Sequence, residues 1–129
     1  MLIVPAGHRL MRRRQLGFAE LLDLDFVGLP RGTALDGHLA MQAARLGRML
    51  RLRVRVSSLD AVCAMVAAGV GVGIVPEAAA RRQRRGLPLG IVRIAEPWAN
   101  RELMLCVRDS KRLSRPAKKL FDALSKHPS

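Results

Sequence analysis

Three glycines, Gly69, Gly71 and Gly73, have the close spacing that phosphate-binding loops use. A dinucleotide-binding glycine run must follow a strand and open a helix, because its amides then face the phosphate. Here the helical pattern 59–69 precedes the glycines and the apolar segment 72–75 follows them, so the order is reversed. We therefore expect these glycines to serve a tight helix-to-strand turn and close packing, and not nucleotide binding.

No combination of side chains in the sequence points to catalysis. Ser57, Ser58 and Ser114 lack the flanking glycines of a nucleophile elbow, and the acidic residues are scattered. The three histidines are isolated from one another, so no metal site is expected. Cys63 and Cys106 lie far apart among apolar residues, which predicts buried free thiols. We predict neither enzyme activity nor a cofactor.

The residues best placed to bind a ligand stand at three predicted helix starts. Thr33, Ser58 and Pro76 each precede a helical pattern, and residues of these types are favoured at such positions. Amides in the first turn of a helix have no intrahelical partner and lie at the positive end of the helix dipole. These positions therefore suit an anion such as a carboxylate.

Short apolar segments alternate with helical patterns along the chain. Strands are expected at 2–4, 26–30, 51–56, 72–75, 91–94 and 103–107, helices at 18–22, 33–46, 59–69, 77–82 and from 114 onward, and a loop at 8–16. This alternation predicts an α/β fold with a mostly parallel sheet flanked by helices. Such sheets bind ligands at the carboxyl ends of their strands, where we expect the three helix starts to lie.

The net charge of +13, from 23 basic and 10 acidic residues, would suit a nucleic-acid partner. The arginines are spread along the chain, however, and no aromatic residues lie among the basic clusters to stack on bases. The densest runs, 12–14 and 81–85, fall in an expected loop and at a helix end, where cations are favoured. Arg51, Arg53 and Arg55 alternate with apolar residues and predict a solvated or partner-facing strand edge. A basic nucleic-acid-binding module stays an alternative, although no helix-turn-helix is visible.

The chain is expected to be cytoplasmic and to have no membrane partner. No apolar run approaches the roughly 20 residues of a membrane span, and the apolar start at residues 1–5 is too short for a signal-peptide core. The second alternative is a substrate-binding component of a small-molecule uptake system. Such a component would need a signal peptide or a lipoprotein cysteine, and the sequence shows neither.

One stretch is specific enough to indicate a family. Residues 56–76, VSSLDAVCAMVAAGVGVGIVP, resemble the strand–helix–strand centre of the LysR-type substrate-binding domain. Residues 2–10 resemble the family's strand followed by H-P-L, with Arg9 in place of the usual proline. Residues 26–33 resemble the strand and loop that open the second lobe, so the resemblance covers essentially the whole chain.

The resemblance implies a two-lobed fold like that of type 2 periplasmic binding proteins, with a small effector in the cleft between the lobes. Residues 17–97 would form the second lobe, and residues 1–16 and 98–129 the remnant of a truncated first lobe with a C-terminal helix. Segments 2–4 and 103–107 would be neighbouring crossover strands outside the main lobe. The DNA-binding helix-turn-helix would lie outside this chain.

The predicted function is therefore that of a ligand-sensing fragment of a LysR-family regulator, which binds a small anionic effector to control transcription. The predicted ligand-binding residues occupy the three helix starts: Pro30, Arg31, Gly32, Thr33, Ser57, Ser58, Pro76 and Glu77. Arg31 would add a charge-assisted contact. Self-association is also expected, because segments 2–4, 103–107 and 115–125 would lack apolar partners. DNA would bind the chain only weakly and without sequence preference.

Overall fold

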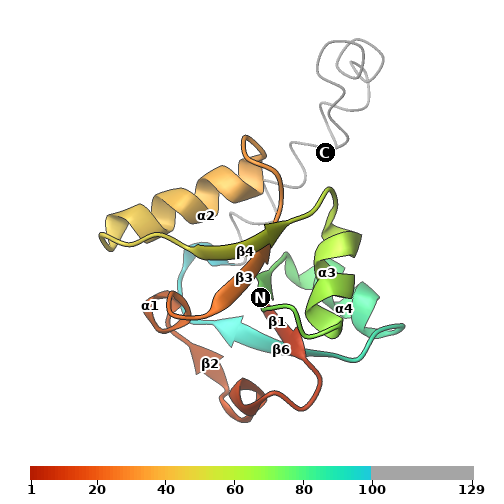
Figure 1. Cartoon of the computed structure of the whole chain (residues 1–129). Helices are drawn as coiled ribbons and strands as arrows, with labels where there is room; N and C mark the ends of the chain where they lie inside the picture. The colour runs from red at the N-terminus through yellow and green to blue at the C-terminus, as the bar shows by residue number, and fades with distance from the viewer. Residues whose placement is uncertain (100–129) are drawn as a thin grey trace, which may run out of the picture.

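The structure, a computed structural model, describes residues 1–99 of the chain (Figure 1). The elements, in order, are β1 (Leu2–Pro5), the 3-10 helix η1 (Arg9–Arg12), β2 (Gln15–Leu16), α1 (Phe18–Leu21), β3 (Asp25–Gly28), α2 (Ala34–Arg45), β4 (Arg51–Arg55), α3 (Leu59–Ala67), β5 (Gly73–Ile74), α4 (Glu77–Arg84) and β6 (Leu89–Ile94). This order confirms the predicted alternation, with η1 and β2 added inside the predicted loop 8–16. The predicted strand 103–107 and the helix from 114 lie outside the described residues. No helix within residues 1–99 is long and apolar enough to cross a membrane.

The sheet is mixed, because one strand runs against all its neighbours. The four-stranded sheet has the order β2-β6-β1-β5, in which β1 pairs antiparallel with both β5 and β6, while β2 is parallel to β6. β3 and β4 form a parallel pair, and a parallel bridge from Phe26 to Val72 joins them to the segment entering β5. Every described strand except β1 therefore runs in one direction. The helices α2, α3 and α4 impose that direction, because each returns the chain to the starting edge of the sheet.

Segment 2–4, expected outside the main lobe, forms an inner strand of the four-stranded sheet. Leu2, Ile3 and Val4 are inaccessible to solvent, and their strand is hydrogen-bonded on both sides. An apolar strand of this kind is stable only between neighbours, and β5 and β6 supply them. Self-association can no longer be argued from this segment. Segments 103–107 and 115–125 lie outside the described residues, and the lobe boundary at residue 17 stays a prediction.

The alternating side chains of β1 divide the interior into two apolar clusters. Leu2 and Val4 pack in a cluster that includes α1 and α2, whereas Ile3 packs in a cluster with α3 and α4. Successive side chains of a strand point to opposite faces, so three consecutive apolar residues need cover on both sides. The predicted arrangement of helices on both faces is confirmed, and Figure 1 shows α2 on one side and α3 with α4 on the other.

Cys63, in the second of these clusters, is a buried free thiol as predicted. Burial raises the pKa of the Cys63 thiol, and the nearby Asp60 carboxylate raises it further, while Arg82 opposes the change. A thiol whose pKa lies above its usual range stays neutral at physiological pH and behaves as a small apolar side chain. Cys106 lies outside the described residues.

The glycine run serves packing, as the sequence predicts. Gly69 ends α3 with a φ of +85°, a conformation that side-chain-bearing residues rarely adopt. A Cβ at Gly71 would lie 2.7 Å from the carbonyl oxygen of Asp25 in β3, and one at Gly73 would lie 2.9 Å from a methyl group of Val62. The missing side chains therefore allow the segment entering β5 to approach β3 and α3 closely.

Replacing Gly71 by alanine is expected to lower the free energy of unfolding by about 1–3 kcal/mol, because the added methyl group would press on the β3 backbone. The matched control is Gly37→Ala, since Gly37 lies in α2 and an added Cβ there has no neighbour within 4 Å. This control should raise the free energy of unfolding by about 0.5–1 kcal/mol. Urea denaturation followed by circular dichroism measures both values, and equal effects at the two positions would contradict the close approach.

Candidate functional site

Three loops leave the carboxyl ends of β3, β4 and β5, and each leads directly into a helix. Residues 29–33 open α2, residues 56–58 open α3, and residues 75–76 open α4. The strands lie in the order β4-β3-β5 and run in the same direction, so the three loops share one edge of the sheet. We call this edge, formed by residues 29–33, 56–58 and 75–76, the carboxyl edge. It contains seven of the eight predicted ligand-binding residues, and Glu77 follows immediately.

The hydroxyl group of Thr33 holds the first loop of the carboxyl edge in shape. Its Oγ1 accepts a hydrogen bond from the Asp36 amide at 3.3 Å and donates one to the Pro30 carbonyl at 2.9 Å. The predicted cap is therefore confirmed, and the side chain is buried. Gly32 has a φ of +90°, which bends the loop before the helix. The Thr33 hydroxyl already donates one hydrogen bond and accepts another, so a ligand at this loop would contact backbone groups instead.

Ser58 caps α3 from the second loop, and both Ser57 and Ser58 are exposed. The Ser58 Oγ accepts a hydrogen bond from the Ala61 amide at 3.1 Å. In the first turn of α3, an Asp60 oxygen accepts a hydrogen bond from Gln83 Nε2 at 2.8 Å, which links α3 to α4. The second loop is thus held by the cap on α3 and by the hydrogen bond between α3 and α4, and it is open to solvent.

Pro76 and Glu77 complete the carboxyl edge at α4. Pro76 is buried and occupies the N-cap position without offering a side-chain acceptor. The Glu77 carboxylate pairs with Arg81 at 2.7 Å along the same helix. This pairing neutralises a charge that would otherwise oppose an anion at the helix start.

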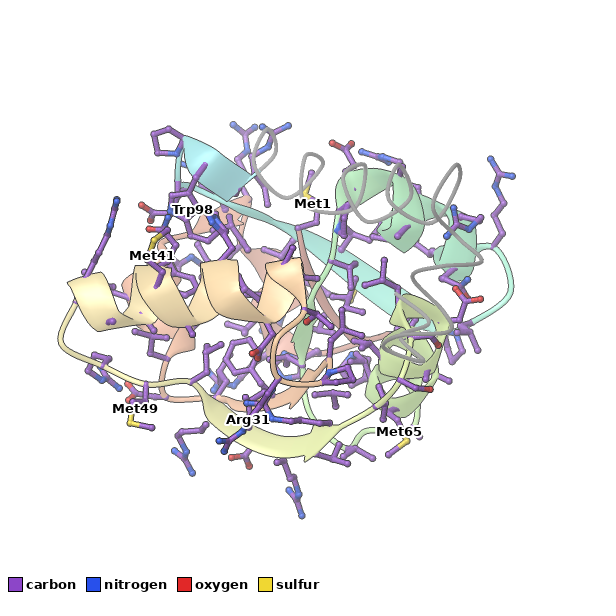
Figure 2. The ribbon with its side chains drawn as sticks, turned by 90° about the horizontal axis from the view of Figure 1, so that it is seen from above. Met1, Arg31, Met41, Met49, Met65 and Trp98 are labelled. Atoms are coloured by element: carbon purple, nitrogen blue, oxygen red, sulfur yellow. The ribbon has the colours of Figure 1, made fainter. Side chains whose placement is uncertain are left out.

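Arg31 supplies positive charge to the carboxyl edge. It is exposed in the first loop, and no carboxylate of residues 1–99 forms an ion pair with it. Figure 2 shows it on the side of α2 that faces β4. Its guanidinium group is therefore available for a charge-assisted contact with a carboxylate.

Arg55 positions the first loop, a role that the sequence did not reveal. Its Nη1 donates to the Leu29 carbonyl at 2.8 Å and to Asp36 Oδ1 at 2.7 Å, and the side chains of Arg55 and Asp36 are only 30% and 14% exposed. The sequence pattern placed Arg55 with Arg51 and Arg53 on a solvated edge. The only local signal of its role was the acid in the first turn of α2, which indicates a nearby cation as well as a cap.

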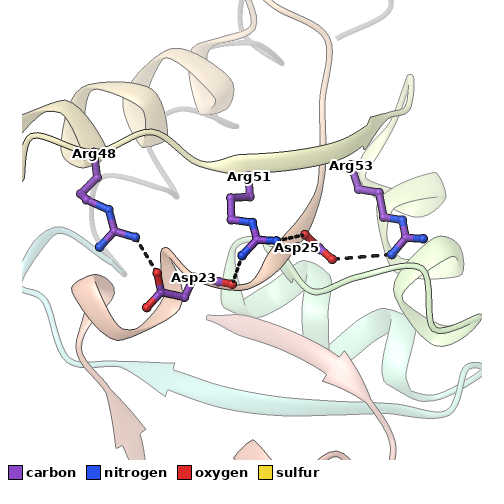
Figure 3. Close-up of polar contacts among 5 residues, drawn as sticks. All are labelled: Asp23, Asp25, Arg48, Arg51 and Arg53. Carbon is purple, nitrogen blue, oxygen red and sulfur yellow. Dashed lines mark hydrogen bonds and ion pairs between the residues drawn. The ribbon is translucent and has the colours of Figure 1, made fainter.

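The other two arginines of β4, and Arg48 in the loop before it, form a row of exposed ion pairs with two aspartates, shown in Figure 3. Arg48 lies 2.7 Å from Asp23, and Arg51 and Arg53 lie 3.4 Å and 3.6 Å from Asp25. Arg51 also donates to the Asp23 carbonyl at 2.8 Å. The predicted solvated strand edge is confirmed here, and these acids reduce its attraction for nucleic acid.

Two partly open pockets lie near the carboxyl edge, and none of the eight predicted residues lines either one. The first, between α2 and the strands β3 and β4, measures only about 20 Å³, which is room for a single water molecule. The second measures about 230 Å³. It adjoins the third loop through Met1, which lines the pocket and whose amine donates to the Val75 carbonyl at 3.1 Å. It is lined by Met1, Arg93, Ile94, Glu96, Pro97 and Ala99. No group of three or more metal-ligating side chains occurs among residues 1–99.

A model of the LysR substrate binding domain matches residues 1–129 of the chain. The chain belongs to this family. No curated protein matches it. These findings agree with the resemblance inferred from residues 56–76. The family is the one expected, helices cover both faces of the sheet, and three helices start at one edge.

Solved structures of LysR-family proteins share the fold. The effector binding domain of QuiR in complex with shikimate has a TM-score of 0.63 at 16% identity, over 74% of this chain and 44% of that one. The BenM effector binding domain with its effector benzoate has a TM-score of 0.61 at 21% identity, over 77% and 46%. HinK, a LysR family transcriptional regulator from Pseudomonas aeruginosa, has a TM-score of 0.59 at 21% identity, over 74% and 33%. This chain thus matches less than half of each of these three proteins.

Replacing Arg55 by glutamine is expected to lower the free energy of unfolding by about 1.5–3 kcal/mol, because the partly buried Asp36 loses its charged partner. The matched control is Arg53→Gln, which removes an exposed pair and should cost less than about 1 kcal/mol. Chemical denaturation of both variants is the measurement. If the two variants were equally stable, Arg55 would not be the residue that fixes the first loop.

Proposed function

We propose that this chain is the ligand-sensing part of a cytoplasmic LysR-type transcriptional regulator, and that it binds a small anion at the carboxyl edge. One observation carries the proposal: three parallel strands end at the same edge of the sheet, and a helix begins directly after each of them. Amides and helix dipoles at such positions favour negative charge. Two similar structures, QuiR and BenM, hold shikimate and benzoate, which are both carboxylates.

The side-chain charges around the carboxyl edge do not oppose an anionic ligand. Each of the three helices has an acid in its first turn, which by itself would repel an anion. Asp36 is paired with Arg55 and Glu77 with Arg81, so two of these charges are neutralised. Asp60 accepts a hydrogen bond from the neutral Gln83 and keeps its charge, which is offset by the exposed Arg31, a residue without an ion pair within residues 1–99. These charges cancel, so the attraction for a carboxylate comes from the three helix starts.

The proposed role is regulation and not catalysis. Residues 17–97 would supply the second lobe of the effector-binding domain, and the carboxyl edge would form one wall of the interlobe cleft. DNA recognition and the opposite wall would come from parts of a LysR-type regulator that these residues do not represent. Association between copies of the domain is part of the same proposal.

The proposal predicts that a negative charge at Ser58 abolishes most anion binding. Ser58→Asp keeps a good N-cap residue on α3 and adds a charge where the ligand would sit. Calorimetric titration of the chain with benzoate and with shikimate should show binding of at least one of them. The aspartate variant should bind it at least about tenfold more weakly, which corresponds to about 1.4 kcal/mol.

Ser58→Asn is the matched control, because asparagine also caps the helix and carries no charge. It should bind within a few-fold of the original chain, and both variants should keep its thermal midpoint. If the aspartate variant bound the carboxylate as tightly as the asparagine variant, the ligand would lie away from α3. If neither carboxylate bound at millimolar concentration, the proposed ligand class would be wrong.

A further inference from the structure

Two arginine runs that are far apart in the sequence come near each other where β1 ends and β6 begins, and the first run then follows β6 as far as Gln15, which pairs with Arg93. Pro5 at the end of β1 pairs with Leu89 at the start of β6, and the Ala6 amide donates to the Pro88 carbonyl at 2.9 Å. The first run, in and after η1, therefore starts beside the turn that ends the second run. Figure 1 shows the segment between β1 and β2 passing along the outer side of β6.

The side chain of Met11 fixes η1 against β6 in this arrangement. A Cβ at Gly90 would collide with the Met11 side chain, so the missing side chain of Gly90 makes room for it. Met11 contacts the Gly90 position while staying 44% exposed, and the neighbouring arginines of η1 are exposed as well. The position of the first run relative to β6 is therefore set by packing.

Six arginines of the two runs, which flank β6, are together called the basic rim: Arg9, Arg12, Arg14, Arg82, Arg84 and Arg85. All six are exposed, and no carboxylate within residues 1–99 pairs with them. Arg13 and Arg81, in the same two runs, are paired with Glu20 at 3.2 Å and Glu77 at 2.7 Å. The dipole of α4 accounts for cations at its own C-terminus, but it does not account for those beside η1.

We propose that the basic rim binds the phosphate backbone of duplex DNA without regard to sequence. Unpaired arginines suit phosphates because the guanidinium group makes bidentate contacts, and each contact releases counterions. Neither run contains Phe, Trp or Tyr, so the rim offers no platform for stacking single-stranded bases. It also lacks the broad apolar face of a membrane-surface helix, because Leu10 is partly buried and the 44% exposed Met11 is a single apolar side chain among the arginines. The rim is separate from the effector site, so it does not depend on the proposed function.

The test measures binding of the 129-residue chain to short labelled duplexes of two unrelated sequences, by fluorescence anisotropy at salt concentrations from about 50 to 200 mM. Two variants remove half of the rim each: R9Q/R12Q/R14Q and R82Q/R84Q/R85Q. The control variant R45Q/R48Q/R53Q removes the same charge from α2, β4 and the loop between them, at the other edge of the sheet. Thermal midpoints verify that each variant is folded.

Each rim variant is expected to bind both duplexes more weakly, and the slope of log K against log salt should fall by up to about 0.9 for each arginine removed. The control should keep the original slope. An equal loss in the control would show that net charge alone attracts DNA, and unchanged binding by both rim variants would place the contact elsewhere. Either result would overturn the proposal. Polyglutamate that competes as effectively as duplex would also overturn it, because the rim would then favour acidic polypeptides in general.

Discussion

The interior of this domain depends on one apolar strand that is covered on both faces. Leu2 and Val4 of β1 pack toward α1 and α2, and Ile3 packs toward α3 and α4. Burial of each such side chain stabilises the fold by about 1.5–3 kcal/mol, and hydrogen bonds to β5 and β6 complete the strand. Because β1 runs against its neighbours, β5 and β6 point the same way although they do not pair with each other.

The carboxyl edge depends on the common direction of β3, β4 and β5. β3, β4 and β5 end at one side of the sheet, so three helices begin there, each with the positive end of its dipole. The close approach at Gly71 sets β5 beside β3, and Arg55 ties the first loop to β4. The site is thus built from backbone groups held by the core, and its side chains mainly shape the loops.

Local patterns predicted the elements well, because caps and periodicity act within a few residues. Thr33 and Ser58 cap the helices that their sequence positions indicated, and the glycines around Gly71 lie between a helix and a strand in the predicted order and pack closely. The place of β1 was missed, since the direction and neighbours of a strand depend on contacts with residues about 70 and 90 positions away. The Arg55–Asp36 pair was missed for the same reason: its partners are 19 residues apart and belong to different elements.

The most direct test of the account is a map of backbone amide shifts during titration with a small carboxylate such as benzoate. The carboxyl edge holds the amides expected to receive the anion, so the largest changes should fall in residues 31–36, 57–61 and 76–79. Residues of η1 and β2, which lie outside that edge, should shift little. Saturable changes confined to other parts of the chain would contradict the claim that the three helix starts form the effector site.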